Sequence, residues 1–86
     1  RETSMLKVHV LVHLRPDILD VQGQAICQTV QAAGHDPLHR VRVGKSFYLD
    51  IDAPDEASAR DEIERLCEET LSNPLLEDYS WEVVDP

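Results

Sequence analysis

Ten residues near the start of the chain alternate between apolar and mostly polar side chains, and this pattern limits the fold more than any other feature. Successive side chains of a β-strand point to opposite faces. A strand over residues 5–14 would therefore place Leu6, Val8, Val10, Val12 and Leu14 on one face and Lys7, His9, Leu11 and His13 on the other. The pattern predicts a sheet that is buried on one face and open on the other, so that helices cover only one side of it.

A helix should follow this strand. Asp20 can cap its first turn, because the carboxylate accepts from the free N–H groups two or three residues further on. The apolar residues of this segment extend to about Ala33, with Ile26 and Val30 on one face, and Gly34 is typical of the left-handed residue that ends a helix. The sequence therefore predicts a helix over residues 21–33.

Two strands joined by a tight turn are expected next. Val41 and Val43 alternate with arginines, and Phe47, Leu49 and Ile51 alternate with polar residues. Gly44 between them would supply the positive φ of a β-hairpin turn. A second helix, capped by Asp55, should carry an apolar stripe of Ala59, Ile63, Leu66, Cys67 and Thr70. Pro74 stops this helix, and Tyr79, Trp81 and Val83 mark a last strand.

The expected order is thus β-α-β-β-α-β. Two amphipathic helices can cover only one face of a four-stranded antiparallel sheet, which predicts an α+β, ferredoxin-like two-layer sandwich. The residues expected to be buried are Leu6, Val8, Val10, Val12, Ile26, Val30, Val41, Val43, Phe47, Leu49, Ile51, Ile63, Leu66 and Trp81.

Length and charge restrict the function. The chain has 86 residues, enough for one small domain, and a formal net charge of −9, which argues against nucleic-acid binding. No apolar run approaches the ~20 residues that span a bilayer. Cys27 and Cys67 are expected to be reduced, buried thiols in a cytoplasmic protein. Residues 1–4 fit no element and are expected to be foreign to the natural chain, which leaves one domain over residues 5–86.

The sequence contains no catalytic constellation that can be proposed from spacing. Lys45 follows a turn glycine but lacks the surrounding phosphate-loop pattern. His9 and His13 share a strand face but lie ~13 Å apart at ~3.3 Å per residue, too far for one metal ion. We therefore expect no catalytic, cofactor-binding or metal-binding residue in this chain.

Three segments together resemble a known family. They are Leu19-Asp20-Val21-Gln22-Gly23, Arg42-Val43-Gly44-Lys45, and the stretch LSNPLLEDYSWEV over residues 71–83. In order and spacing, from about Met5 to Val84, the chain is similar to the PurS family, the small subunit of the bacterial and archaeal multi-subunit phosphoribosylformylglycinamidine synthase. Val21 departs from the family pattern, in which many members carry Pro at the first helical position.

The resemblance implies a non-catalytic scaffold subunit in purine biosynthesis. It would bring together a glutaminase subunit and an ATP-dependent synthetase subunit, in the cytoplasm, and leaves open a part in ammonia transfer. ATP, Mg and glutamine would be used by those partner subunits, with no cofactor in this one. The resemblance also implies self-association as dimers and leaves open their pairing into tetramers, which agrees with the unpaired edge strands of so small a sheet.

Polar positions that match the family motifs are the candidates for partner contacts: Asp20, Gln22, Arg42 and Lys45. The glycines Gly23, Gly34 and Gly44 are assigned to backbone geometry instead. An alternative is a small-molecule-binding regulatory module of the ACT type, which shares the element order, although the chain lacks the expected glycine-rich ligand loop. A stand-alone enzyme on the same fold agrees least with the residues.

Overall fold

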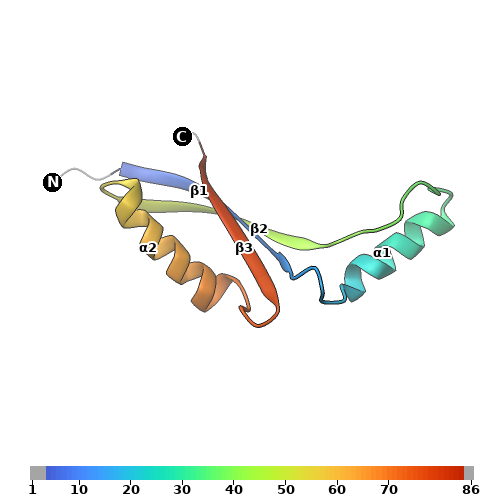
Figure 1. Ribbon diagram of the computed structural model, residues 1–86. Coiled ribbons are helices and arrows are strands. Elements are labelled where there is room, and N and C mark those ends of the chain that lie inside the picture. Colours follow the sequence, from blue (N-terminus) through green and yellow to red (C-terminus); the bar gives the residue numbers. More distant parts are fainter. Residues whose placement is uncertain (1–3, 85–86) are drawn as a thin grey trace.

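The computed structural model describes residues 4–84 of the chain (Figure 1). Its elements are β1 (Ser4–Leu14), α1 (Val21–Ala32), β2 (Gly44–Ala53), α2 (Glu56–Leu66), the π-helical turn η1 (Cys67–Leu71) and β3 (Glu77–Val84). Within these residues the strands form one antiparallel sheet in the order β2-β1-β3. The elements thus follow one another as β-α-β-α-β.

The phase predicted for the first strand is confirmed. Val8, Val10 and Val12 are at most 1% exposed, whereas Lys7 and His13 are exposed. β1 is the central strand, so it has a neighbour on each side. Its register runs from Ser4 opposite Ala53 to His13 opposite Gly44 in β2, and from Lys7 opposite Val84 to Leu14 opposite Glu77 in β3.

The prediction of a four-stranded sheet is wrong, because the sheet of the described residues has three strands. The segment expected to be the second strand, residues 40–43, forms no ladder and lies beside α1 instead. Val43 N–H donates to a carboxylate oxygen of Asp20, 2.6 Å away, in place of a backbone carbonyl. The alternation of Val41 and Val43 is real, and both residues are half-buried, but no neighbouring strand of the described chain pairs with them.

The hairpin turn expected at Gly44 is also absent. Gly34 is the one glycine of residues 4–84 with a positive φ, at 104°, as expected for a residue just after a helix end. Gly44 instead begins β2 and continues an extended run of chain from residue 38 (Figure 1). A Cβ at Gly44 would lie 2.9 Å from the carbonyl oxygen of Val12, so close packing against β1 explains the glycine.

One helix, α2, covers the apolar face of the sheet. It is capped by Asp55, whose carboxylate accepts from Ser58 N–H at 2.7 Å, as predicted. The core consists of Val8, Val10, Val12, Ala53, Ala59, Ile63 and Cys67, with half-buried residues such as Phe47, Leu49, Tyr79 and Trp81 around it. Of the stripe predicted for this helix, Ala59, Ile63 and Cys67 join the core, whereas Leu66 is only half-buried outside it and Thr70 is exposed.

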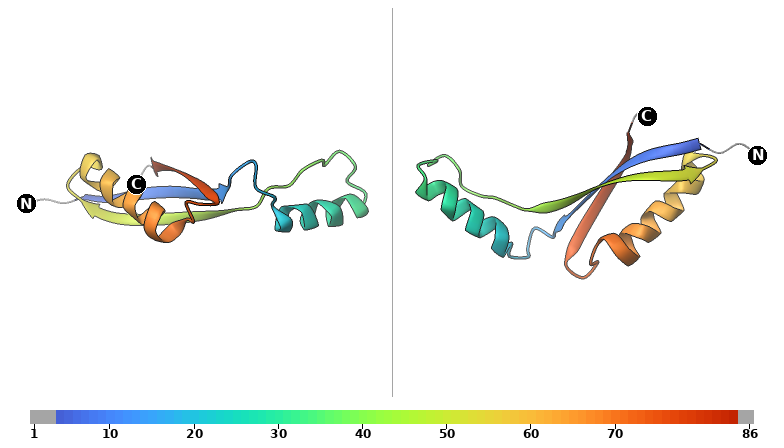
Figure 2. Two further views of the ribbon diagram at one scale, coloured as in Figure 1. Left: turned by 60° about the horizontal axis from the view of Figure 1, so that its bottom comes forward. Right: turned by 180° about the vertical axis from the view of Figure 1, so that it is seen from behind.

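The helix α1 does not pack on the sheet, contrary to the predicted sandwich. Both views in Figure 2 show it beyond the end of the strands, joined to them by two lengths of chain. Its buried residues are Gly23 and Cys27, which face residue 41, while Ile26 remains 39% exposed. The molecule is accordingly elongated, with extents of 58 × 28 × 14 Å. We refer to α1 and residues 33–43 together as the arm.

Candidate functional site

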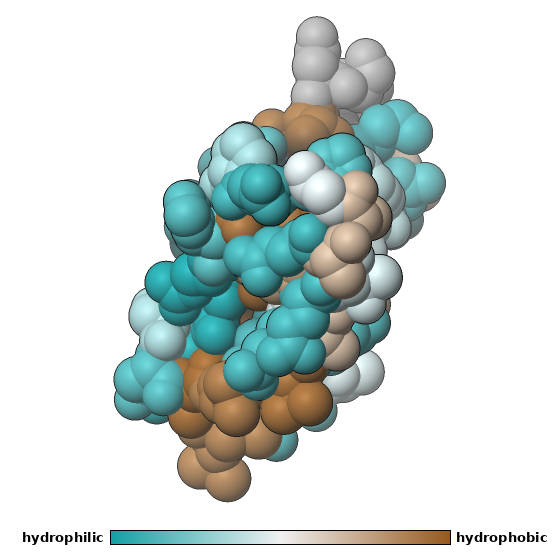
Figure 3. Space-filling model, turned by 90° about the vertical axis from the view of Figure 1, so that its right-hand side faces the viewer, coloured by the Kyte–Doolittle hydropathy of each residue, from teal (hydrophilic) through white to brown (hydrophobic). Residues whose placement is uncertain are grey.

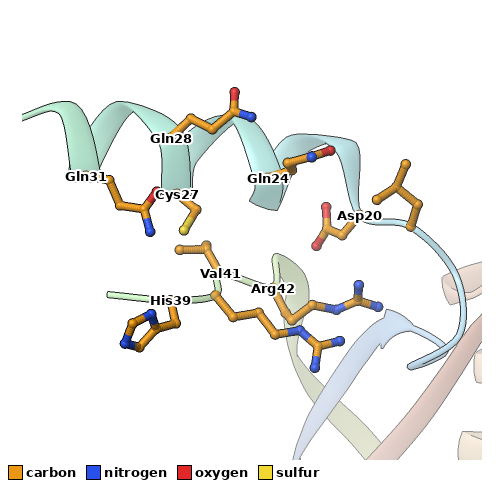
Figure 4. A pocket seen from close by; sticks show the side chains of 10 residues that line it. Asp20, Gln24, Cys27, Gln28, Gln31, His39, Val41 and Arg42 are labelled. Carbon is orange, nitrogen blue, oxygen red and sulfur yellow. The ribbon is translucent and has the colours of Figure 1, made fainter. Parts of the chain in front are cut away.

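The arm encloses a cleft between α1 and the extended residues 38–43, with a volume of about 340 Å³ (Figure 4). One wall carries the carboxamides of Gln24, Gln28 and Gln31, which recur along one side of α1. His39 and Arg40 contribute to the facing wall. The cleft is therefore lined with groups that donate and accept hydrogen bonds, and it suits a polar ligand or a polar segment of another protein.

Asp20 holds the base of the arm together. One oxygen of its carboxylate accepts from Val43 N–H at 2.6 Å, and the other accepts from Gly23 N–H at 2.8 Å, which caps α1. These two backbone bonds, the one from Val43 above all, lower the pKa of Asp20 below its usual 3.8, with a smaller contribution from the charge of Arg42. The bond from Gly23 confirms the predicted N-cap. The same buried carboxylate also links the start of α1 to the returning chain at Val43.

Arg42 also links the two lengths of chain at the base of the arm. Its guanidinium donates to the carbonyl oxygens of Ile18 at 3.0 Å and Arg15 at 2.9 Å. Both acceptors belong to the connection between β1 and α1, so Arg42 ties the outgoing and returning chains of the arm together. The arginine selected from the family motif thus has a structural function, and its exposed guanidinium also borders the cleft.

Gly23 is explained by close approach. A Cβ at this position would collide with the carbonyl oxygen of Val41, which lies against the first turn of α1. The sequence identified Gly23 as a residue chosen for backbone geometry, but its φ is not positive. The glycine is needed because Val41 lies so close to α1, a position that the sequence did not predict.

Gln22 and Lys45 lie around a second hollow of about 240 Å³, on the other side of Asp20. Lys45 Nζ is 3.6 Å from a carboxylate oxygen of Glu77, so the lysine has a partner within the chain. Gln22 is exposed, with no hydrogen bond of its side chain in the described residues. The structure thus brings Asp20, Gln22 and Lys45 to one place, while Arg42 faces the neighbouring cleft.

A further group of interacting side chains between α2 and β3 was not found from the sequence. Tyr79 donates to a carboxylate oxygen of Glu68 at 2.9 Å, and burial together with this carboxylate raises the pKa of Tyr79 to about 12. The guanidinium of Arg60 lies 5.0 Å from the centre of the Trp81 ring. Burial, with the nearby Glu64 and Glu68, also raises the pKa of the Cys67 thiol, which keeps it protonated at neutral pH.

Some kinds of chemistry find no support in residues 4–84. No group of three or more His, Cys, Asp and Glu side chains is placed to hold a metal ion there. No helix of this part of the chain is long and apolar enough to cross a membrane. Cys27 and Cys67 are both buried free thiols, as the sequence predicted.

Comparison with known proteins decides the family. The family model described as PurS, phosphoribosylformylglycinamidine (FGAM) synthase, matches residues 7–85. The chain belongs to the PurS family. The resemblance read from its motifs is thereby confirmed, and the chain belongs to a subunit family of a ligase of purine biosynthesis.

Individual PurS proteins are similar to this chain over most of their length. The PurS subunit of Bacillus subtilis is 37% identical over 82 residues, which cover 92% of this chain and 93% of that protein. The PurS subunit of Synechocystis is 38% identical over 74 residues, or 86% of this chain and 74% of that protein. A solved structure of PurLQS from Thermotoga maritima contains a chain with a TM-score of 0.87 and 27% identity, covering 94% of this chain and 99% of that one.

Proposed function

We propose that this chain is the non-catalytic assembly subunit of phosphoribosylformylglycinamidine synthase, placed between a glutaminase subunit and an ATP-dependent synthetase subunit. The observation that carries the proposal is its PurS fold, which recurs in the PurLQS structure from Thermotoga maritima with a TM-score of 0.87. ATP, Mg and glutamine are used by the partner subunits in this proposal, and all three proteins act in the cytoplasm.

The geometry supports an assembly function because the polar side chains at the base of the arm hold the arm in place. Asp20 and Arg42 direct their hydrogen bonds to the backbone of residues 15–43. What the arm offers to its surroundings is extended surface, with the carboxamides of α1 on one side and Gln22 on another. Such a surface suits contact with another protein, and the match to PurS over residues 7–85 leaves no observation that favours an ACT-type module.

We also propose that the chain self-associates. A compact domain of this length has a radius of gyration of about 12 Å, whereas this chain has 16.9 Å. Leu19 and Val21 at the start of the arm are 67% and 68% exposed. Hydrophobic residues also gather at the lower end of the face shown in Figure 3, most of which is otherwise hydrophilic. A second copy would cover surface that a small three-stranded sheet cannot bury alone.

Reconstitution tests the assembly function. The glutaminase and synthetase subunits are mixed with and without this chain, and product formation is followed with glutamine or with ammonium salt as nitrogen donor. We expect glutamine-dependent synthesis to require the chain and ammonia-dependent synthesis by the synthetase to proceed without it. Equal glutamine-dependent rates with and without the chain would refute the proposal, as would turnover of glutamine or ATP by the purified chain alone.

A further inference from the structure

One edge of the sheet runs along β3, which pairs only with β1 and has no partner strand on its other side in the described chain. Arg15 N–H donates to Leu76 O at 2.9 Å, and the register of β1 and β3, continued by one residue, places these two residues opposite each other. Because bonded and unbonded pairs alternate along an antiparallel ladder, the even-numbered residues of β3 bond to β1. The backbone N–H and C=O groups of Tyr79, Trp81 and Val83 therefore point outward from the sheet.

A groove of about 700 Å³ follows this edge between β3 and α2. Its lining includes Trp81 and Val83 from the core face of β3, and Ser80 and Glu82 from the open face. Side chains from both faces of one strand can line the same hollow only at the free edge of that strand. Figures 1 and 2 show α2 and β3 side by side, joined by a turn at one end. The groove therefore runs along residues 79–83, about 17 Å at ~3.4 Å per residue.

The part of the groove beneath α2 is apolar. Tyr79, Trp81 and Val83 pack against the core but stay half-buried, so part of each side chain remains accessible. A strand added to this edge would place every second side chain against them. Cross-strand contacts with aromatic and β-branched residues are among the favourable ones in a sheet. The groove thus suits an extended segment with apolar side chains at alternate positions.

The rim of the groove is acidic. Glu56 and Glu64 come from α2, and Glu82 comes from β3. Arg60 is the one cation of the lining, and it pairs with Glu56 at 3.6 Å. The side chains of Glu64 and Glu82 have no ion pair within residues 4–84. A lysine or arginine placed opposite Glu82 would form a favourable cross-strand pair.

A second copy of this chain is poorly suited to the edge. β3 itself carries Glu77, Asp78 and Glu82 and no basic residue. Two copies of β3 side by side would bring further negative charge to a rim that is already negative, and juxtaposed like charges suppress association. The formal net charge of −9 acts in the same direction. The charges therefore favour a basic segment of a different protein.

We propose that a basic, extended segment of another subunit of the synthase pairs with β3 as an additional strand and lies in the groove beside α2. The proposal rests on the assembly function proposed above and names its docking surface. Main-chain bonds to Tyr79, Trp81 and Val83 supply affinity in this mode of recognition, and alternate side chains supply specificity. The segment carries apolar residues toward Trp81 and lysine or arginine toward Glu82.

Proline at position 83 tests the backbone bonds. Val83→Pro removes an outward N–H, and proline is tolerated on an edge strand where that group faces solvent. Val83→Ala is the matched control, because it also loses the valine side chain but keeps the N–H. Binding of each variant to the synthetase subunit and to the glutaminase subunit is titrated separately. We expect Val83→Pro to bind one of them about tenfold more weakly than Val83→Ala. Equal affinities for both subunits would overturn the proposal.

Charge reversal tests the acidic rim. Glu64→Lys places a cation beside the groove, whereas Asp61→Lys, at an exposed position of α2 outside the groove, makes the same change of net charge. Glu64→Lys should weaken binding about tenfold more than Asp61→Lys at low salt, and added salt should weaken binding of the original chain. Equal effects of the two substitutions would exclude a basic segment in this groove.

Hydrogen exchange tests the edge without any substitution. In the chain alone, the amides of Tyr79, Trp81 and Val83 should exchange faster than those of Ser80 and Glu82, which bond to β1. In the complex with both enzyme subunits, the three outward amides should become protected. Unchanged exchange of these amides, in a complex that retains glutamine-dependent synthesis, would contradict the added strand.

These outcomes separate the edge from the assembly function. If the original chain supports glutamine-dependent synthesis and every edge variant is equally active, the function stands and only the edge is lost. An original chain that binds neither subunit would refute both. Sedimentation velocity of Val83→Pro should show the same self-association as the original chain. A weaker self-association would assign the edge to a second copy and overturn the proposal.

Discussion

At the scale of single residues, Asp20 shows how one side chain positions a whole segment. Its carboxylate accepts from Gly23 N–H and from Val43 N–H, so a helix start and a returning chain meet at the same charge. A neutral side chain would accept less strongly, because hydrogen bonds to an ionised acceptor are roughly twice as strong as neutral ones. The base of the arm therefore depends on the ionisation of one residue.

Acid should weaken this junction. The pKa of Asp20 in the folded protein lies below its usual 3.8, so its contribution to the free energy of unfolding is complete above about pH 4 and is lost as pH falls through the folded pKa. Asp20→Asn should lower stability at pH 7 and lose less stability than the original chain between pH 4 and pH 2. Urea unfolding across this range measures it. Equal pH profiles for both chains would contradict the assignment.

Gly23 should resist replacement by a better helix former. Alanine is favoured over glycine within a helix by about 1 kcal/mol, but a Cβ here collides with the carbonyl oxygen of Val41. We expect Gly23→Ala to lower the free energy of unfolding by at least about 1 kcal/mol, as steric conflicts with backbone do. Gln24→Ala, at the next and exposed position, should be neutral. Thermal melting compares the two variants. A stabilised Gly23→Ala variant would show that residue 41 can move away from α1 at little cost.

Gln22 and Lys45 remain candidates for partner contacts. Both are exposed, although Lys45 pairs with Glu77, whose side chain is only 15% exposed. Gln22→Ala should change the free energy of unfolding by no more than ~0.5 kcal/mol, as is typical of surface substitutions, and Lys45→Ala by up to ~1 kcal/mol, the upper range for an ion pair open to solvent. We expect both to raise the concentration of this chain needed for half-maximal glutamine-dependent synthesis. Unchanged titration curves would remove both residues from the proposed contact.

At the scale of elements, the two helices have different functions. α2 contributes Ala59 and Ile63 to the core, and η1 adds Cys67. α1 contributes nothing to that core and is held by its first turn and by Cys27. The difference follows from the connections, since residues 38–43 carry α1 beyond the end of the sheet.

The same substitution in each helix should therefore have unequal effects. Ile63 is fully buried, and Ile63→Ala should lower the free energy of unfolding by about 2–5 kcal/mol, which can unfold so small a domain. Ile26 is 39% exposed, and Ile26→Ala should cost well under half as much. Chemical denaturation measures both, with the milder Ile63→Val as a companion if Ile63→Ala does not fold. Equal losses would indicate that α1 packs into a core that one chain does not show.

At the scale of the whole molecule, elongation is the property that the arm produces. The radius of gyration of 16.9 Å belongs to the single chain, so a monomer in solution should have it too. Small-angle scattering at concentrations low enough for the chain to be monomeric should give a value close to this one. A value near the ~12 Å of a compact domain would mean that α1 folds back onto the sheet when the second copy is absent.

Much of the local structure follows from the sequence. The alternation of Leu6 to Leu14 determined which face of β1 is buried, Asp20 and Asp55 marked the starts of both helices, and Gly34 marked the end of the first. These signals succeed because their causes are local: the two-residue period of a strand, and the unpaired N–H groups of a helix start. The family motifs identified PurS for a related reason, since they are short segments in a fixed order.

Only the tertiary structure decided where the elements go. Val41 and Val43 carry the pattern of a strand, and the sequence cannot show whether an apolar face packs on a sheet or on a helix. Here the close approach of Gly23 to Val41 and the bonds of Asp20 and Arg42 keep that segment on the arm, so the hairpin never forms. Contacts between residues far apart in the chain made this choice, and periodicity within one segment contains no information about them.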